Sequence, residues 1–167
     1  MRHTANDNGF SLIELLIVVA IILIIAAVAI PNLLRARIAA NESSAVASVR
    51  TSISAELIYN TAYPTLGYTA LANLGGPVAC VPGPGSACII DSQLTSGSKS
   101  GYQFTAAGTN PIGGANSNYL IDAWPITQGV TGNRAFCAME DNVIRATNPS
   151  TGAPTRAACI TYISIPD

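Results

Sequence analysis

One long apolar segment limits how this chain can fold more than any other feature. Residues Phe10 to Ile30 read FSLIELLIVVAIILIIAAVAI, and Glu14 is the only ionisable side chain among them. A helix of about 20 apolar residues is long enough to cross the hydrocarbon core of a bilayer. The segment therefore predicts a membrane-spanning helix close to the N-terminus of the chain.

A removable secretory signal peptide is the main alternative for this segment. Ala27-Val28-Ala29 offers the small-x-small pattern at which such peptides are cut. Asp7 offsets Arg2 ahead of the segment, Glu14 lies inside it, and helix-forming sequence continues beyond Ala29. These three features favour a helix that stays in the mature protein, either as a specialised anchor or as an ordinary single span.

The four cysteines all follow the apolar segment, at Cys80, Cys88, Cys137 and Cys159. An even number of cysteines in an exported domain favours two disulfides, and three pairings are open. A zinc site is the alternative, but there is no Cys-x-x-Cys and the only histidine is His3. We predict the pairs Cys80–Cys88 and Cys137–Cys159, because each pair is closest in sequence and closes a turn-rich loop. Disulfides place this part outside the cytosol, although positive-inside counting alone mildly favours the opposite orientation.

The sequence after Pro31 predicts an amphipathic helix. It contains no glycine or further proline up to Asn60, and its apolar residues mostly recur at steps of three or four. If this helix continues the apolar segment from about Ser11, the whole spans on the order of 75 Å. Tyr63-Pro64 marks its end. The expected buried stripe is Ile38, Ala45, Val46, Val49, Ile53 and Leu57.

The remainder predicts a small antiparallel sheet that covers the stripe, giving an α+β fold. Residues 64–100 are rich in glycine and proline and indicate a variable connecting loop. Glu140-Asp141-Asn142 is expected to close a hairpin, and Phe104, Phe136 and Trp124 are expected in the core. The β-prone stretches are Tyr102–Ala106, Tyr119–Pro125, Arg134–Met139, Val143–Ala146 and Ile160–Ile165.

Composition argues against an enzyme or a nucleic-acid-binding protein. The formal net charge is -1 and only 10% of residues are charged, so no broad basic surface for nucleic acid is expected. No nucleophile–base pair is recognisable, and no cofactor is expected. A calcium site built from Asp91, Asp122, Glu140 and Asp141 is a minor alternative, since EF-hand-like spacing is absent.

The start of the apolar segment also carries a family signature. Gly9-Phe10-Ser11-Leu12-Ile13-Glu14-Leu15-Leu16-Ile17-Val18, followed by Pro31, resembles the prepilin signature of type IV pilins and secretion pseudopilins. The resemblance covers about the first third of the chain. It implies that a membrane-embedded prepilin peptidase cuts between Gly9 and Phe10 and methylates the new amino group of Phe10.

The resemblance also implies a division of the chain and a pilin fold. Residues 1–9 would be the leader, 10–31 the transmembrane and polymerisation helix, and 32–62 the amphipathic half of the same helix. Residues 63–167 would be the globular head, with the loop at 64–100 and the sheet and C-terminal disulfide loop at 101–167.

Two residues of the helix have both a simple and a specific interpretation. Glu14 could reach lipid headgroups at the membrane surface, whereas the resemblance implies pairing with the Phe10 ammonium of a neighbouring subunit. Pro31 could end the membrane helix, whereas the resemblance implies a kink within one long helix. The resemblance makes both of them, with Phe10, the predicted assembly residues.

We therefore expect a structural subunit of a type IV pilus, with no metal or other cofactor. Its partners would be identical copies in a helical filament, the inner membrane that it spans once before assembly, the prepilin peptidase and the pilus assembly machinery. The filament would be extracellular. The alternative is a minor pilin or a pseudopilin of a type II secretion system. The sequence does not select among adhesion, motility and DNA uptake.

Overall fold

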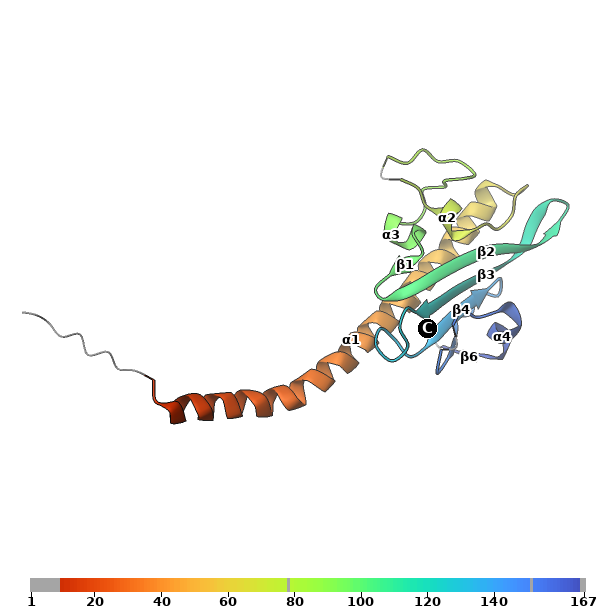
Figure 1. Cartoon of the computed structure of the whole chain (residues 1–167). Helices are drawn as coiled ribbons and strands as arrows, with labels where there is room; N and C mark the ends of the chain where they lie inside the picture. Colours follow the sequence, from red (N-terminus) through yellow and green to blue (C-terminus); the bar gives the residue numbers. More distant parts are fainter. Residues whose placement is uncertain (1–9, 78, 151, 166–167) are drawn as a thin grey trace, which may run out of the picture. The chain divides into compact units, whose positions relative to one another are not determined.

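The computed structural model describes residues 10–77, 79–150 and 152–165. These residues form two compact units, divided between Ala36 and Arg37. The first helix, α1, runs from Leu12 to Ala62 and contributes to both units (Figure 1). All other helices and strands belong to the second unit, which is called the head below.

The head contains one six-stranded antiparallel sheet in which each strand pairs with its neighbours in the chain. Gly113 and Gly114, both with positive φ, make the two-residue turn between the two long strands. This sheet, together with α1, confirms the predicted α+β fold. The strands are β1 Ser98–Lys99, β2 Tyr102–Ile112, β3 Ala115–Pro125, β4 Ala135–Met139, β5 Arg145–Thr147 and β6 Ile163–Ser164.

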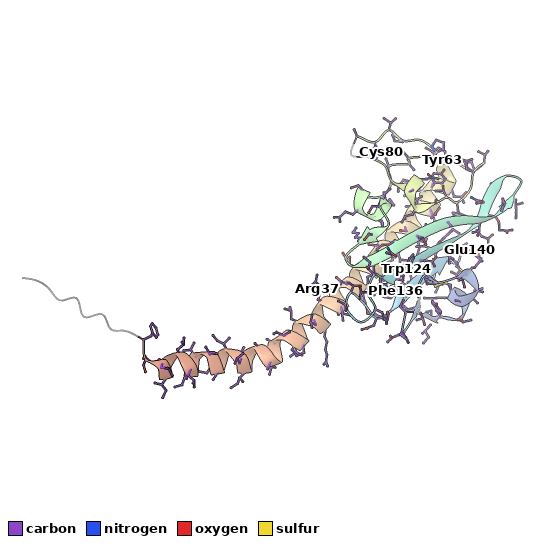
Figure 2. All side chains as sticks on the ribbon, viewed as in Figure 1. Arg37, Tyr63, Cys80, Trp124, Phe136 and Glu140 are labelled. Carbon is purple, nitrogen blue, oxygen red and sulfur yellow. A yellow bond between two sulfur atoms is a disulfide. The ribbon has the colours of Figure 1, made fainter. Side chains whose placement is uncertain are left out.

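The main core lies between the later part of α1 and one face of the sheet. Ala45, Val49 and Tyr59 of α1 are fully or almost fully buried, as the apolar stripe predicted for the first two. Phe104 and Phe136 lie in this core as expected, whereas Trp124 points to the other face and is only half-buried (Figure 2). Burial of such side chains supplies most of the stability of a small domain.

The predicted stripe is wrong at Leu57, which is 41% exposed. Successive helical residues turn by about 100°, so the buried face that contains Val49 and Ile53 continues to Glu56 and Tyr59. Glu56 therefore occupies the core position that the apolar pattern predicted for Leu57.

The predicted strand at Ile160–Ile165 is also wrong in its first part. Residues Arg156–Thr161 form a short helix, α4, and only β6 is extended. The Thr155 hydroxyl oxygen accepts a hydrogen bond from the Ala158 backbone N–H, which caps the start of this helix. Local capping therefore overrides the β propensity of the sequence that follows.

The connecting segment holds more regular structure than predicted. It contains helices α2, Leu71–Leu74, and α3, Ser92–Thr95, as well as the edge strand β1. Asp91 caps α3 by accepting the Leu94 backbone N–H at 2.9 Å, and it also pairs with Lys99 at 3.0 Å. The segment is thus fixed to the head at its C-terminal end.

Candidate functional site

The first half of α1 is apolar on all sides and exposed in the single chain. Between Leu12 and Ile30 the large apolar side chains are 46 to 80% exposed, apart from Phe10 ahead of them at 89%. By length and composition this helix can cross a membrane. A helix that is hydrophobic all round needs lipid or another apolar partner around it. This surface is the candidate assembly site.

Glu14 lies at the start of this helix. Its Oε2 accepts the backbone N–H of Ser11 at 3.0 Å, and the Leu15 N–H donates to the Ser11 carbonyl at 3.3 Å. A glutamate at the third helical position often caps the helix N-terminus in this way. Phe10, directly before this cap, is exposed. Gly9, the predicted residue before the cleavage site, lies outside the described residues.

Pro31 lies inside α1, which continues from Leu12 to Ala62. It therefore does not end the helix, and the simple interpretation is wrong. The proline ring removes the backbone N–H that would bond to the Ala27 carbonyl. The helix at this point is held by one hydrogen bond fewer than its neighbours.

Two buried glutamates connect α1 to the rest of the head. Glu42 accepts the backbone N–H groups of Asn133 and Arg134, and its Oε2 also pairs with Arg134 Nε at 2.8 Å. Glu56 is fully buried, and its Oε2 accepts the Thr69 backbone N–H at 3.0 Å. Its Oε1 has no hydrogen-bond partner among the described residues. Burial raises the pKa of Glu56 to about 7, and the bond from Thr69 acts in the opposite direction.

The four carboxylates considered for calcium do not come together. Glu140 pairs with Arg156, Asp141 pairs with Arg145, and the pKa of each of these carboxyls is lowered chiefly by its arginine. In the parts of the chain that the structure describes, no three His, Cys, Asp or Glu side chains are grouped to hold a metal ion. The remaining two, Asp91 and Asp122, lie on other elements of the head.

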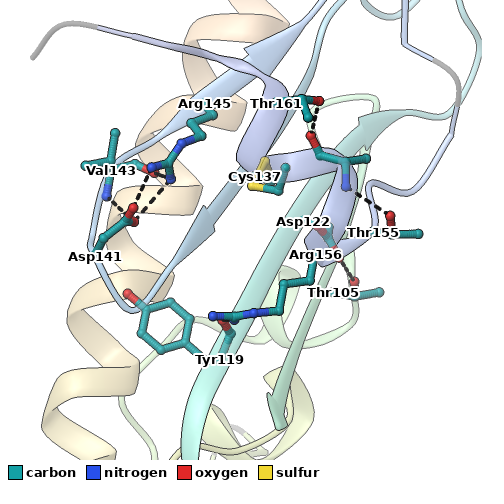
Figure 3. The surroundings of a disulfide bond; sticks show 12 residues. Thr105, Tyr119, Asp122, Cys137, Asp141, Val143, Arg145, Thr155, Arg156 and Thr161 are labelled. Carbon is teal, nitrogen blue, oxygen red and sulfur yellow. Dashed lines mark hydrogen bonds and ion pairs between the residues drawn. A yellow bond between two sulfur atoms is a disulfide. The ribbon is translucent and has the colours of Figure 1, made fainter. Parts of the chain in front are cut away.

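The structure joins Cys80 to Cys88 and Cys137 to Cys159, with Cα–Cα distances of 5.9 and 6.0 Å. The first disulfide closes a proline-rich turn, and the Tyr59 hydroxyl donates to the Pro84 carbonyl in that turn at 2.7 Å. The second connects β4 to α4 on the sheet face opposite α1 (Figure 3). This pairing remains a prediction.

Sequence reasoning did not identify Glu42 or Glu56 as residues with special surroundings, and it named Asp122 only as one of four carboxylates for a calcium site. Both glutamates recur on the helix face of Ala45 and Val49, which was the available signal. Their hydrogen-bond donors lie elsewhere in the sequence: Thr69 donates to Glu56 and Arg134 to Glu42. No local pattern therefore shows these contacts.

Comparison with known proteins identifies the class to which the start of this helix corresponds. Residues 4–30 match the family described as the prokaryotic N-terminal methylation motif. The chain is thus a protein with a prepilin-type N-terminus and a pilin-like α+β fold.

A named relative is the type IV wide pilus major component PilA4 of Thermus thermophilus. The two chains are 48% identical over 73 residues, which cover 42% of this chain and 55% of the relative. The chain thus spans about half the length of that protein. The predicted resemblance to type IV pilins is confirmed. No solved structure matches the chain.

Proposed function

We propose that this chain is the structural subunit of a type IV pilus and polymerises through the first half of α1. The observation that carries the proposal is the exposed apolar helix that begins within a methylation motif and continues into a folded head. Such a helix suits both lipid, before assembly, and the centre of a filament of identical copies. The similarity to a pilus major component supports the same role.

Glu14 would determine how copies align. Lipid and a packed helical core are about equally apolar, so the transfer of α1 from one to the other gains little hydrophobic free energy. A carboxylate in hydrocarbon costs about 2.5–3.5 kcal/mol or more, and an oppositely charged partner offsets this cost. The Phe10 ammonium of a neighbouring subunit would be that partner, and the pairing would set the axial register.

The proposal assigns the segments as follows. Residues 1–9 are the leader, removed by a prepilin peptidase between Gly9 and Phe10, and residues 10–31 are the single inner-membrane span before assembly. The pilus assembly machinery then builds the extracellular filament. Residues 32–62 and 63–167 form the part of each subunit that lies outside the cell. Pro31 provides a local weak point in the helix. The role is structural, and we assign it no catalytic step.

A minor pilin or a pseudopilin is the second candidate, because the same N-terminal motif is found in both classes. The weakly charged surface and the two disulfides of the head favour a major subunit exposed outside the cell.

Mass spectrometry of filaments sheared from cells tests the proposal. We expect this chain to be the most abundant protein in that fraction and to begin with a methylated Phe10. A mature N-terminus at Ile30, as signal-peptidase cleavage after Ala29 would produce, contradicts it. A methylated Phe10 in a protein confined to the cell envelope would instead support the pseudopilin assignment.

A further inference from the structure

Asp122 is a buried carboxyl on the sheet face opposite α1. It is 6% exposed and lies on β3, directly between Thr105 of β2 and Cys137 of β4. The Thr105 hydroxyl donates to Asp122 Oδ2 at 3.4 Å (Figure 3). Asp122 Oδ1 has no hydrogen-bond partner among the described residues. The filament proposed above gives this carboxyl no role.

Its cross-strand neighbour Cys137 belongs to the disulfide that fastens α4 to the sheet. Side chains directly opposite on antiparallel strands lie on the same face, with Cβ atoms about 4.5–5.5 Å apart. The carboxyl of Asp122 is therefore within reach of the Cys137 sulfur. Cys137 is fully buried, so bulk water cannot serve as its proton acceptor.

The two sulfurs of this disulfide differ in their surroundings. Cys137 lies in the middle of β4, between two other strands, whereas Cys159 lies on the six-residue helix α4. Cys159 is itself fully buried, like Cys137, but Ile160, the residue after it, is 63% exposed. An external thiol or disulfide that reaches this bond when α4 moves thus meets Cys159 first. Cys137 is therefore the sulfur that attacks Cys159 when the disulfide forms and the leaving group when the disulfide is reduced.

We propose that Asp122 is the proton acceptor and donor for Cys137 when the Cys137–Cys159 disulfide forms and breaks. When the disulfide forms, Cys159 first reacts with a small-molecule disulfide outside the cytosol and becomes a mixed disulfide with a small thiol. The Cys137 thiol gives its proton to Asp122, and the thiolate attacks the Cys159 sulfur. The Cys137–Cys159 bond forms, and the small thiol leaves as a thiolate with the electron pair of the broken bond. In reduction, the departing Cys137 thiolate recovers the proton from Asp122.

The electrostatics of this face suit such a role. The charged groups around the disulfide form ion pairs with each other. Arg145 on β5 pairs with Asp141, and Arg156 on α4 pairs with Glu140. Burial raises the pKa of Asp122 to about 7, while the Thr105 bond acts to lower it. A group with a pKa near the working pH can both accept and return a proton.

The test is the rate at which a small thiol reduces each disulfide in the full-length protein in detergent micelles. Differential alkylation and peptide mass spectrometry follow both disulfides in the same sample, and rates are divided by the concentration of attacking thiolate. For the wild type, we expect reduction of Cys137–Cys159 to slow as the pH rises through about 7. For Asp122→Asn, we expect a rate below pH 7 lower by about tenfold or more, without this inflection.

The Cys80–Cys88 disulfide is the internal control, and its rate is expected to be the same in both proteins. Thr105→Val keeps the carboxyl but removes its hydrogen bond, so the inflection should move to higher pH. This variant tests the proposal even if Asp122→Asn does not fold. Equal pH profiles in all three proteins, or faster reduction in Asp122→Asn, would overturn the proposal. Faster reduction would mean that the charge of Asp122 merely repels thiolates.

Discussion

Buried Glu56 makes the head less stable as the pH rises, and Glu56→Gln isolates this effect. The folded-state pKa is about 7 against an ordinary value of 4.5, so the folded head retains this proton where the unfolded chain has lost it. One pKa unit corresponds to about 1.4 kcal/mol, so the difference between the folded-state and unfolded-state pKa values corresponds to about 3 kcal/mol. This contribution is fully present below pH 4.5, is lost between pH 4.5 and about 7, and stays lost above.

Urea unfolding of the full-length protein in micelles, followed by the fluorescence of the single tryptophan, measures the effect. Between pH 4.5 and 7.5 we expect the free energy of unfolding of Glu56→Gln to rise relative to wild type by about 3 kcal/mol. Glu140→Gln is the matched control. The pKa of Glu140 is lowered by Arg156, so its contribution is lost only as the pH falls below 4.5, and the difference between Glu140→Gln and wild type should hardly change between pH 4.5 and 7.5. If the difference between wild type and Glu56→Gln does not depend on pH, Glu56 is ionised in the folded head and the reasoning is wrong.

Two further predictions concern the head. Non-reducing peptide mapping should recover the two disulfides seen in the structure, and a peptide linking Cys80 to either C-terminal cysteine would contradict this pairing. Glu42→Gln should destabilise the head by about 2 kcal/mol, because hydrogen bonds to a charged group contribute about 1.5–3 kcal/mol. Thermal unfolding measures this loss, and Ser43→Ala on the exposed side of the helix is the control.

The fold class was predictable because its main signals are local. A continuous apolar run and the three- and four-residue spacing of Ala45, Val49 and Ile53 define the two halves of α1 without knowledge of the head. The predicted strands agree with the sheet to within one residue at Ala135–Met139. They were too short for β2 and β3, since the Gly113-Gly114 turn that extends this hairpin was not recognised.

Features that depend on distant parts of the chain were not predictable. Glu56 is buried because the segment around Thr69 folds over it, and Asp122 because α4 is fastened across the sheet. Such contacts join residues with no common sequence pattern. The start of α1, in contrast, was recognised from consecutive residues, and for Glu14 the partner remains a proposal because it would lie on another copy.

Glu14→Val separates the two interpretations of the only carboxylate in the membrane segment. The substitution removes an insertion cost of about 2.5–3.5 kcal/mol, so the precursor should enter the membrane at least as well as wild type. Its N-terminal cap, the bond to the Ser11 N–H, is lost, but this bond is exposed in the single chain and the rest of the helix does not depend on it. Ile17→Val is the control, because it changes the same helix without removing a charge.

In a filament, by contrast, the Phe10 ammonium of each Glu14→Val subunit would be enclosed without its partner. An unpaired buried charge costs more than a removed pair, about 3–5 kcal/mol when one partner alone is deleted. Filament assembly repeats this cost at every subunit, so the variant should accumulate as a cleaved, methylated membrane protein and be scarce in the sheared extracellular fraction. The measurement is the amount of subunit in that fraction, with cleavage at Phe10 established by mass spectrometry. A wild-type yield of filaments from cells that make only this variant would show that Glu14 serves the membrane surface and not the register of assembly.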